Sequence, residues 1–365
     1  MSGVPAADGS AGAGARAGAA GTADAAPARG ANDLALERYR QMRRIRTFEE
    51  RVGELFVRGE SAGSMLHLSI GEESAAVGAC AAMAGGDTFT THHRGHGIFL
   101  ARGADPDRMM AEIAGKEAGY CRGKGGSMHI ADSGLGHLGA NAIVGGGIPA
   151  VVGAALAAKR AGDGALSCAF FGDGATGQGV LYEAMNMAAL WDLPAMFVCV
   201  NNQWGMGTRI DRATRATDLH ARARAFGLAG ESVDGEDVEA VEGAARALFD
   251  AARAGRPGFL AVSCYRHFGH ARKDKSPYRT EAEEAEGRER DPVRRARERL
   301  VADRRDEATL AGIDAAAAAE MDAAVDFAVR AEPPALDSMF EGVYAPEEPA
   351  PEPVAARLDR VLARA

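Results

Sequence analysis

The chain has 365 residues, of which 51 are acidic and 42 basic, so its formal net charge is −9. This charge argues against a nucleic-acid-binding surface, and no apolar run is long enough to span a membrane. The five cysteines are scattered and form no CxxC pair, so we expect buried thiols in a reducing, cytoplasmic compartment.

Composition divides the chain into three parts. Residues 1–33 are rich in Ala and Gly and nearly free of large apolar side chains, so we expect this segment to be disordered. It lacks the pattern of a signal peptide. It is also a poor match to a mitochondrial transit peptide, because such peptides avoid acidic residues. Residues 34–345 are expected to form one α/β domain, and the acidic, proline-rich start of residues 346–365 predicts a linker and a short tail.

The first periodic segment is helical. Apolar residues recur at intervals of three and four from Leu34 to Arg58, which predicts a long helix that ends near Gly59. Ser69 and Glu72 have the spacing of a capping box and predict a helix that continues through Met83. His67 lies just before this box, on the predicted loop.

A histidine-rich segment follows, with the sequence TTHHRGHG over residues 90–97. No carboxylate or cysteine accompanies its three histidines at ligand spacing, which disfavours a metal site. An anion site is favoured, because the guanidinium of Arg94 matches the geometry of a phosphate. His93 lies beside Arg94, and His96 is as well explained by a structural role as by one in orienting the loop.

Two further segments precede the centre of the chain. Residues 119–128, GYCRGKGGSM, form a basic glycine-rich loop, which alone is weak evidence for phosphate binding. A helix of small residues is predicted over 148–161, and another helix should begin at Asp105-Pro106, where proline takes the first turn.

The central unit is a strand–helix–strand pattern. Leu166–Phe171 and Met196–Val200 have the length and apolar composition of buried parallel strands, and Val180–Leu190 between them has the pattern of a helix. The strands of such a unit lie side by side. Asp173 and Asn202, which follow the two strands, should therefore lie at the carboxyl edge of one sheet, where open α/β folds bind ligands.

Asp173 and Asn202 offer the oxygen ligands of a hard cation that also binds a diphosphate. The main-chain carbonyl near Trp204 could supply a third oxygen. Glycines on both sides of Asp173 would allow the backbone to approach a phosphate. Asp-Gly pairs are common in turns, but the joint pattern of GDG, helix, Leu-Pro, apolar strand and Asn-Asn is far more specific.

The rest of the chain predicts one more strand. Phe259–Cys264 is an apolar run, and the polar residues that follow it place His270 at the same sheet edge. Asp234-Gly235 predicts a turn between two helices. The helices expected after the central unit cover residues 218–226, 238–254, 280–300 and 308–331.

Taken together, these motifs resemble the thiamine diphosphate motif. In detail, GDGATGQG…EAMNMAALWDLP…NNQWGMGT is similar to the α subunit of the E1 component of 2-oxo acid dehydrogenase complexes. The resemblance covers roughly residues 34–344. It implies a thiamine diphosphate-binding α/β fold, with a mostly parallel sheet and helices on both faces, and it implies thiamine diphosphate and Mg²⁺ as cofactors.

The resemblance also implies roles for individual residues. Asp173, Asn202 and the main-chain oxygen of Trp204 would hold Mg²⁺. His67 and His270 would handle protons and guide the acyl group, as candidate catalytic residues, because imidazoles ordinarily titrate near neutrality. The positions that would contact the cofactor are His93, Arg94, Ala142, Val144, Asp173, Gly174, Ala175, Asn202 and His270.

The implied activity is that of an E1 α subunit, which cleaves acetoin or decarboxylates pyruvate and passes the two-carbon acyl unit to a lipoyl group on an E2 acyltransferase. The segments TTHHRGHG and LGANAIVGGGIP look closer to acetoin dehydrogenase, yet pyruvate and branched-chain 2-oxo acids stay open. The activating Glu of thiamine enzymes comes from a second domain. The expected assembly is therefore an α2β2 heterotetramer in which a β subunit donates that Glu.

Two other classes of protein are less favoured. A Rossmann dehydrogenase would require a GxGxxG motif after an early strand, with an acid downstream, and the chain has none. A non-catalytic scaffold that kept the fold is opposed by the intact set of site residues named above.

Overall fold

The computed structural model describes residues 31–342, 360 and 362–363. The predicted disordered segment, residues 1–33, lies outside the described residues except for 31–33, which belong to the first helix, α1 (Ala31–Val57). The predicted linker and tail, residues 346–365, lie outside them except for the three residues named above. In the described part of the chain, no helix is both long and apolar enough to cross a membrane.

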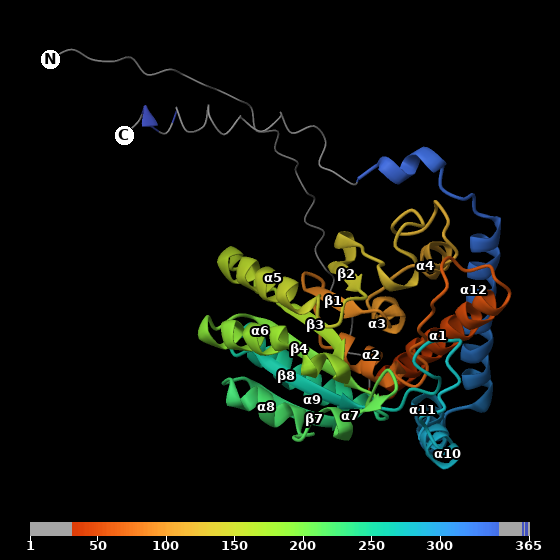
Figure 1. Cartoon of the computed structure of the whole chain (residues 1–365). Coiled ribbons are helices and arrows are strands. Elements are labelled where there is room, and N and C mark those ends of the chain that lie inside the picture. Colours follow the sequence, from red (N-terminus) through yellow and green to blue (C-terminus); the bar gives the residue numbers. More distant parts are fainter. Residues whose placement is uncertain (1–30, 343–359, 361, 364–365) are drawn as a thin grey trace, which may run out of the picture.

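A six-stranded sheet forms the centre of the molecule (Figure 1). Every neighbouring pair of strands in it is parallel, and the order is β2-β1-β3-β4-β8-β7. The predicted α/β class with a parallel sheet is thus confirmed. The strands are β1 (Thr88–His92), β2 (His137–Asn141), β3 (Ser167–Gly172), β4 (Ala195–Asn201), β7 (Ala229–Asp234) and β8 (Gly258–Ser263).

Helices cover both faces of the sheet, which explains why its central strands are apolar throughout. In β3, Cys168 and Phe170 join one buried cluster, while Ala169 and Phe171 join the cluster on the opposite face. Because both faces are buried, no polar residue alternates along this strand. The predicted strands at 166–171, 196–200 and 259–264 each agree with the structure to within a residue at most positions.

On one face lie α5 (Ile148–Ala161), α6 (Gly179–Leu190) and α8 (Leu219–Ala225) (Figure 1). On the other lie α2 (Glu73–Cys80), α3 (His96–Ala101) and α9 (Val238–Arg253). An outer layer packs over α2 and α3 and contains α1 together with α4 (Pro106–Ile113), α11 (Pro292–Ala302) and α12 (Glu307–Arg330). The long apolar stripe predicted for α1 is buried in this layer.

Three strands of the six-stranded sheet were not predicted, and each lacks a continuous apolar run. A separate two-stranded sheet, β5 (Trp204–Gly205) and β6 (Thr208–Arg209), was not predicted either. β7 has the sequence AGESVD and is an edge strand with no buried residue. β2 is the other edge, and β1 consists of TFTTH. Because β1 ends at His92, the segment that follows it carries His93 and Arg94 to the carboxyl edge of the sheet.

Two predicted helix starts differ from the structure. The capping box at Ser69 is wrong: α2 begins at Glu73, and the Ser69 hydroxyl donates to Glu49 instead. The helix predicted over 280–300 is divided at Asp291 into α10 (Glu281–Glu289) and α11, because the Asp291 side chain caps a new helix with proline in its first turn. The start predicted at Asp105-Pro106 is confirmed, since the Asp105 side chain caps α4.

Candidate active site

The two residues expected to hold a metal follow neighbouring strands. Asp173 opens a short 3-10 turn, η3 (Asp173–Gly177), directly after β3, and Asn202 follows β4. These strands pair in parallel with Gly172 opposite Val200. The two side chains therefore lie at the same carboxyl edge of the sheet, as the strand–helix–strand pattern predicted.

A cavity of about 440 Å³ opens at this edge, which is the size range of small-ligand sites. The structure brings every predicted site residue to its wall, from segments that are far apart in the sequence. The predicted residues that line it are His67, His93, Arg94, Ala142, Val144, Asp173, Gly174, Ala175, Asn202, Trp204 and His270.

Asp173 is a buried acid without an ion-pair partner among the described residues. Its residue is 4% exposed. Burial raises its pKa to about 6, and its own backbone N–H and the nearby Arg266 offset that effect only in part. A cation at this point would remove the cost of the buried negative charge, so the donor chemistry fits a metal ion.

The orientation of Asn202 is set by a buried acid, Glu72, which sequence reasoning missed as a site residue. The Nδ2 of Asn202 donates to Oε1 of Glu72 over 2.8 Å, which leaves the amide oxygen as an acceptor. That oxygen now accepts from the backbone nitrogen of Trp204 at 3.2 Å. Glu72 was expected to cap a helix, and only the tertiary fold reveals that it contacts Asn202.

Arg266 is a second residue of the cavity that was missed. It is 1% exposed, and its Nη1 lies 3.4 Å from the main-chain oxygen of Trp204, one of the expected metal ligands. Burial, with the charges of Arg94 and Arg279, lowers its pKa to about 10. Its position just after β8 is the signal that could have found it, since polar residues there face the sheet edge.

Arg94 links the two segments that carry the candidate catalytic histidines. Its Nη1 donates to the carbonyl of Leu68 at 2.7 Å, and its Nη2 donates to the carbonyl of His270 at 2.9 Å. Its Nε lies 3.9 Å from Glu72, which balances its charge. The side chain therefore lines the cavity while much of its hydrogen-bonding capacity is used by the backbone.

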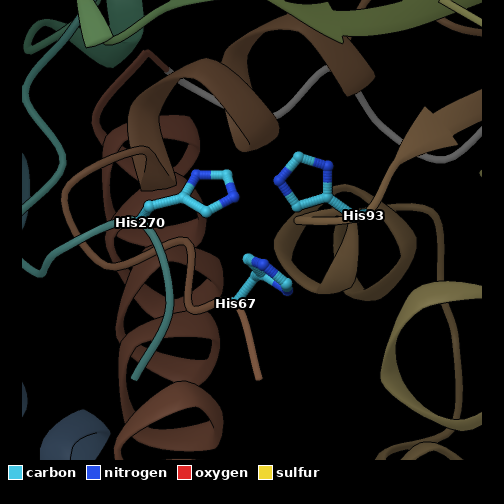
Figure 2. A group of neighbouring side chains, drawn as sticks. All are labelled: His67, His93 and His270. Atoms are coloured by element: carbon cyan, nitrogen blue, oxygen red, sulfur yellow. The ribbon is translucent and has the colours of Figure 1, made fainter. Parts of the chain in front are cut away.

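Figure 2 shows three imidazoles that converge from separate segments. The ring centroids of His67 and His93 are 4.5 Å apart, those of His67 and His270 4.9 Å, and those of His93 and His270 5.4 Å. In the described part of the chain, the buried Nδ1 of His67 and Nε2 of His93 have no hydrogen-bond partner. Such atoms are costly to bury, so a polar ligand in the cavity would be favoured.

All three imidazoles are neutral at neutral pH. Burial, with the charge of Arg94, lowers the pKa of His67 to about 3 and that of His270 to about 4, and it places the pKa of His93 far below its usual range. The expectation that His67 and His270 titrate near neutrality is therefore wrong for the free cavity. The same positive charge opposes a metal ion on the three nitrogens and favours an anion, which would raise these pKa values.

Hydrogen bonds within the loop that carries His270 fix its conformation. The Oδ2 of Asp274 accepts from the backbone nitrogen of His270 at 2.7 Å and from the hydroxyl of Tyr278 at 2.5 Å. Arg279 donates to the carbonyls of Arg266 and Phe268. These contacts hold the His270 side chain beside the other two imidazoles.

The glycine-rich loop at residues 119–128 surrounds an internal anion. The buried carboxylate of Glu112 accepts from four of its backbone nitrogens, those of Cys121, Gly123, Gly125 and Gly126. A Cβ on Gly123 would lie 2.6 Å from backbone, and one on Gly125 would lie 2.7 Å from backbone. The glycines thus allow the backbone to surround Glu112. The loop reaches the cavity only through Met128.

Comparison with known proteins identifies the class. The family model described as dehydrogenase E1 component matches residues 40–337, so the chain belongs to that family. The predicted family and its oxidoreductase class are thereby confirmed. No site residue is tested by this match, and the roles given to them stay predictions.

Particular relatives carry two kinds of name. The α subunit of acetoin:2,6-dichlorophenolindophenol oxidoreductase from Bacillus subtilis is 46% identical over 255 residues, which are 70% of this chain and 76% of the relative. The corresponding subunit from Cupriavidus necator is 46% identical over 246 residues, 67% of this chain and 74% of the relative. The α subunit of the pyruvate dehydrogenase E1 component from Zymomonas mobilis is 43% identical over 311 residues, 84% of this chain and 88% of the relative.

Proposed function

We propose that this chain is the α subunit of a thiamine diphosphate-dependent E1 dehydrogenase that cleaves acetoin or decarboxylates pyruvate and transfers the two-carbon unit to a lipoyl group. Residues 34–345 would form its diphosphate-binding domain. The observation that carries the proposal is the cavity at the carboxyl edge of the sheet, where Asp173, Asn202 and the three histidines meet in a chain of the E1 family.

The cavity has suitable groups for the diphosphate end of the cofactor. Asp173, the amide oxygen of Asn202 and the carbonyl of Trp204 would hold Mg²⁺, since this cation takes one or two protein carboxylates together with phosphate oxygens. The backbone at Gly174 and Ala175, in the first turn of η3, would face the phosphates. The buried charge of Asp173, which nearby groups offset only in part, is the feature that supports this assignment.

Thiamine diphosphate, when bound, supplies a nucleophilic carbon and an acceptor for the electrons released when a bond to a carbonyl carbon breaks. The protein residues bind, orient and handle protons. His67 and His270 are neutral in the free cavity, so they can accept a proton or a hydrogen bond, and a bound diphosphate would raise their pKa toward neutrality. Arg94 would hold the two histidine segments at a fixed distance.

A β subunit would complete the site. The relatives are named as α subunits, which supports a β partner in an α2β2 E1. The wall of the cavity carries apolar side chains that are open to solvent in this chain, since Ile143 is 72% exposed, Val144 49% and Met206 64%. A partner that covers them would also exclude water from the cavity and could donate the activating Glu. The lipoyl-bearing E2 would then accept the acyl group.

The substrate that supplies the two-carbon unit is either acetoin or a 2-oxo acid. Relatives of both names match at similar identity, 46% and 43%, so acetoin and pyruvate are both proposed, with branched-chain 2-oxo acids as the alternative. A scaffold without catalysis is disfavoured because, in the described part of the chain, a buried acid without an ion pair and unpartnered imidazole nitrogens are costly to keep.

The test is co-expression with a β subunit encoded beside this chain, followed by assays with acetoin, pyruvate and branched-chain 2-oxo acids and an artificial electron acceptor. We expect turnover of acetoin or pyruvate that depends on thiamine diphosphate and Mg²⁺, and none from the α chain alone. A complex with Asp173→Asn is the matched control and should be inactive. Full activity of the α chain alone, or an active Asp173→Asn complex, would overturn the proposal.

A further inference from the structure

A fully buried carboxylate in α1 joins the segments that form the cavity wall. Glu49 is 0% exposed, and it lies outside the set of residues that line the cavity. Its Oε1 accepts from the backbone nitrogen of Ser69 at 3.0 Å and from the Ser69 hydroxyl at 2.6 Å. Its Oε2 lies 3.1 Å from Nδ1 of His96.

His96 extends this contact to a third segment. Its Nε2 lies 2.9 Å from the hydroxyl and 3.2 Å from the carbonyl of Ser127, which precedes the cavity residue Met128. His96 is 1% exposed and begins α3. One carboxylate and one imidazole therefore connect the segments around residues 67–69, 93–96 and 127–128.

The contacts act on the cavity through short stretches of backbone. Ser69 is two residues from His67, and His96 is two residues from Arg94. The carbonyl of Leu68, between His67 and Ser69, accepts from Arg94 at 2.7 Å. The segments are closely packed here as well, because a Cβ on Gly97 would lie 3.0 Å from Ile45 and 3.2 Å from the Ser69 hydroxyl.

We propose that Glu49 is a positioning residue, which through Ser69 and His96 fixes His67, His93 and Arg94 at the distances that the cofactor requires. This inference rests on the proposed function for the identity of the cofactor. The contacts of Glu49 with Ser69 and His96, which we call the clamp, rest on the geometry alone. A carboxylate accepts on both oxygens while an amide accepts on one only, so an amide could replace it only if His96 changed its tautomer. Burial opposes the charge of Glu49, yet His96 and the two Ser69 donors outweigh burial and lower its pKa.

The matched control is a buried carboxylate at the opposite end of the sheet. Asp87 precedes β1 and accepts from the backbone nitrogens of Leu166 and Ala84 and from Arg253. Its residue is 1% exposed. Asp87→Asn should therefore cost stability as Glu49→Gln does, without an effect on the geometry of the cavity.

The experiment uses the α chain with its β subunit and has two measurements. Binding of thiamine diphosphate with Mg²⁺, measured by calorimetric titration of the complex, should weaken about tenfold or more in Glu49→Gln and in His96→Gln. The double variant should bind better than the sum of the single effects predicts, since the two residues act as one unit. Asp87→Asn should bind as the parent does.

The second measurement does not need the cofactor. In the cofactor-free complex, amide hydrogen exchange should rise in residues 66–72 and 92–97 of Glu49→Gln but stay unchanged around Asp87. If the parent fails to bind thiamine diphosphate, the proposed function fails, while this exchange pattern still decides the clamp. Parental cofactor affinity in Glu49→Gln, an equal loss in Asp87→Asn, or unchanged exchange in residues 66–72 and 92–97 would overturn the inference.

Discussion

The amide of Asn202 is held by Glu72, whose Oε1 accepts from Nδ2 over 2.8 Å. An asparagine that must present its oxygen to a cation needs its NH₂ group occupied elsewhere, and Glu72 provides that acceptor. Glu72 is fully buried, and burial raises its pKa, so it holds this position at an energetic cost. The cost indicates a function in the orientation of Asn202.

Substitution of Glu72 tests this orientation. Glu72→Ala should weaken Mg²⁺-dependent cofactor binding by roughly 10- to 100-fold, because the amide of Asn202 is then free to rotate. Glu72→Gln is the conservative control and should bind within a few-fold of the parent, since its side-chain oxygen can still accept from Asn202. Calorimetric titration of the αβ complex measures both, and equal affinities in the Ala and Gln variants would contradict the assignment.

The raised pKa of Asp173 predicts how cofactor binding depends on pH. Mg²⁺ requires the carboxylate, and with a pKa of about 6 this form is lost as the pH falls through 6. Affinity should drop about twofold at pH 6 and about tenfold at pH 5, after correction for the ionisation of the free ligand. The correction comes from a separate titration of thiamine diphosphate. Affinity that is constant from pH 7 to pH 5 would show either that the pKa of Asp173 is not raised or that Asp173 does not bind the metal.

The neutral histidines predict that the cofactor-free chain becomes less stable in acid. The pKa of His67 is about 3 in the folded chain against an ordinary value of 6.5, so only the unfolded chain binds this proton between those limits. The free energy of unfolding should therefore fall as the pH drops below 6.5. His67 alone contributes a slope of about 1.4 kcal/mol per pH unit between pH 6 and pH 4.

This slope can be measured by chemical denaturation at several pH values. Replacement of the imidazole in His67→Asn should remove the contribution of one proton from the slope, whatever its effect on stability at pH 7. A slope that is identical in His67→Asn and the parent would show that His67 is protonated in the folded chain.

The close packing of backbone around Glu112 predicts that one added methyl group, in Gly123→Ala, lowers the stability of the chain strongly. Gly123→Ala should destabilise the chain by several kcal/mol, because φ is +73° and the Cβ would lie 2.6 Å from the backbone of Gly115. Gly243→Ala is the matched control in α9, where a Cβ meets nothing within 4 Å, and it should stabilise by about 0.5–1 kcal/mol. Thermal unfolding compares the two, and equal melting temperatures would contradict the close approach.

The central unit of the fold was predictable because its signals are local. β3, α6 and β4 are each marked by composition and length, and their parallel pairing follows from the handedness of the connection. The same reasoning correctly predicted that Asp173 and Asn202 lie together at one edge of the sheet. The edge strands β2 and β7 were missed because an edge strand does not need apolar residues on both faces.

Three buried carboxylates were not predictable in this way. Glu49, Glu72 and Glu112 lie in sequences where an acid is ordinary. Glu49 and Glu72 meet His96 and Asn202 across the tertiary fold, and Glu112 meets its donors in a loop that follows its helix. Glu72 even matched a local pattern, the capping box, for which the structure shows another partner. The depressed pKa values of the histidines likewise depend on burial by segments that are distant in the sequence.

The most direct test of the central claim is a crystal structure of the αβ complex with thiamine diphosphate and with Mn²⁺ in place of Mg²⁺. We expect an anomalous difference peak about 2 Å from a carboxylate oxygen of Asp173, the amide oxygen of Asn202 and the carbonyl of Trp204. The diphosphate should lie on the same ion, beside Gly174 and Ala175. A peak on the imidazoles of His67, His93 and His270, or a cofactor bound without a metal at Asp173, would contradict the account.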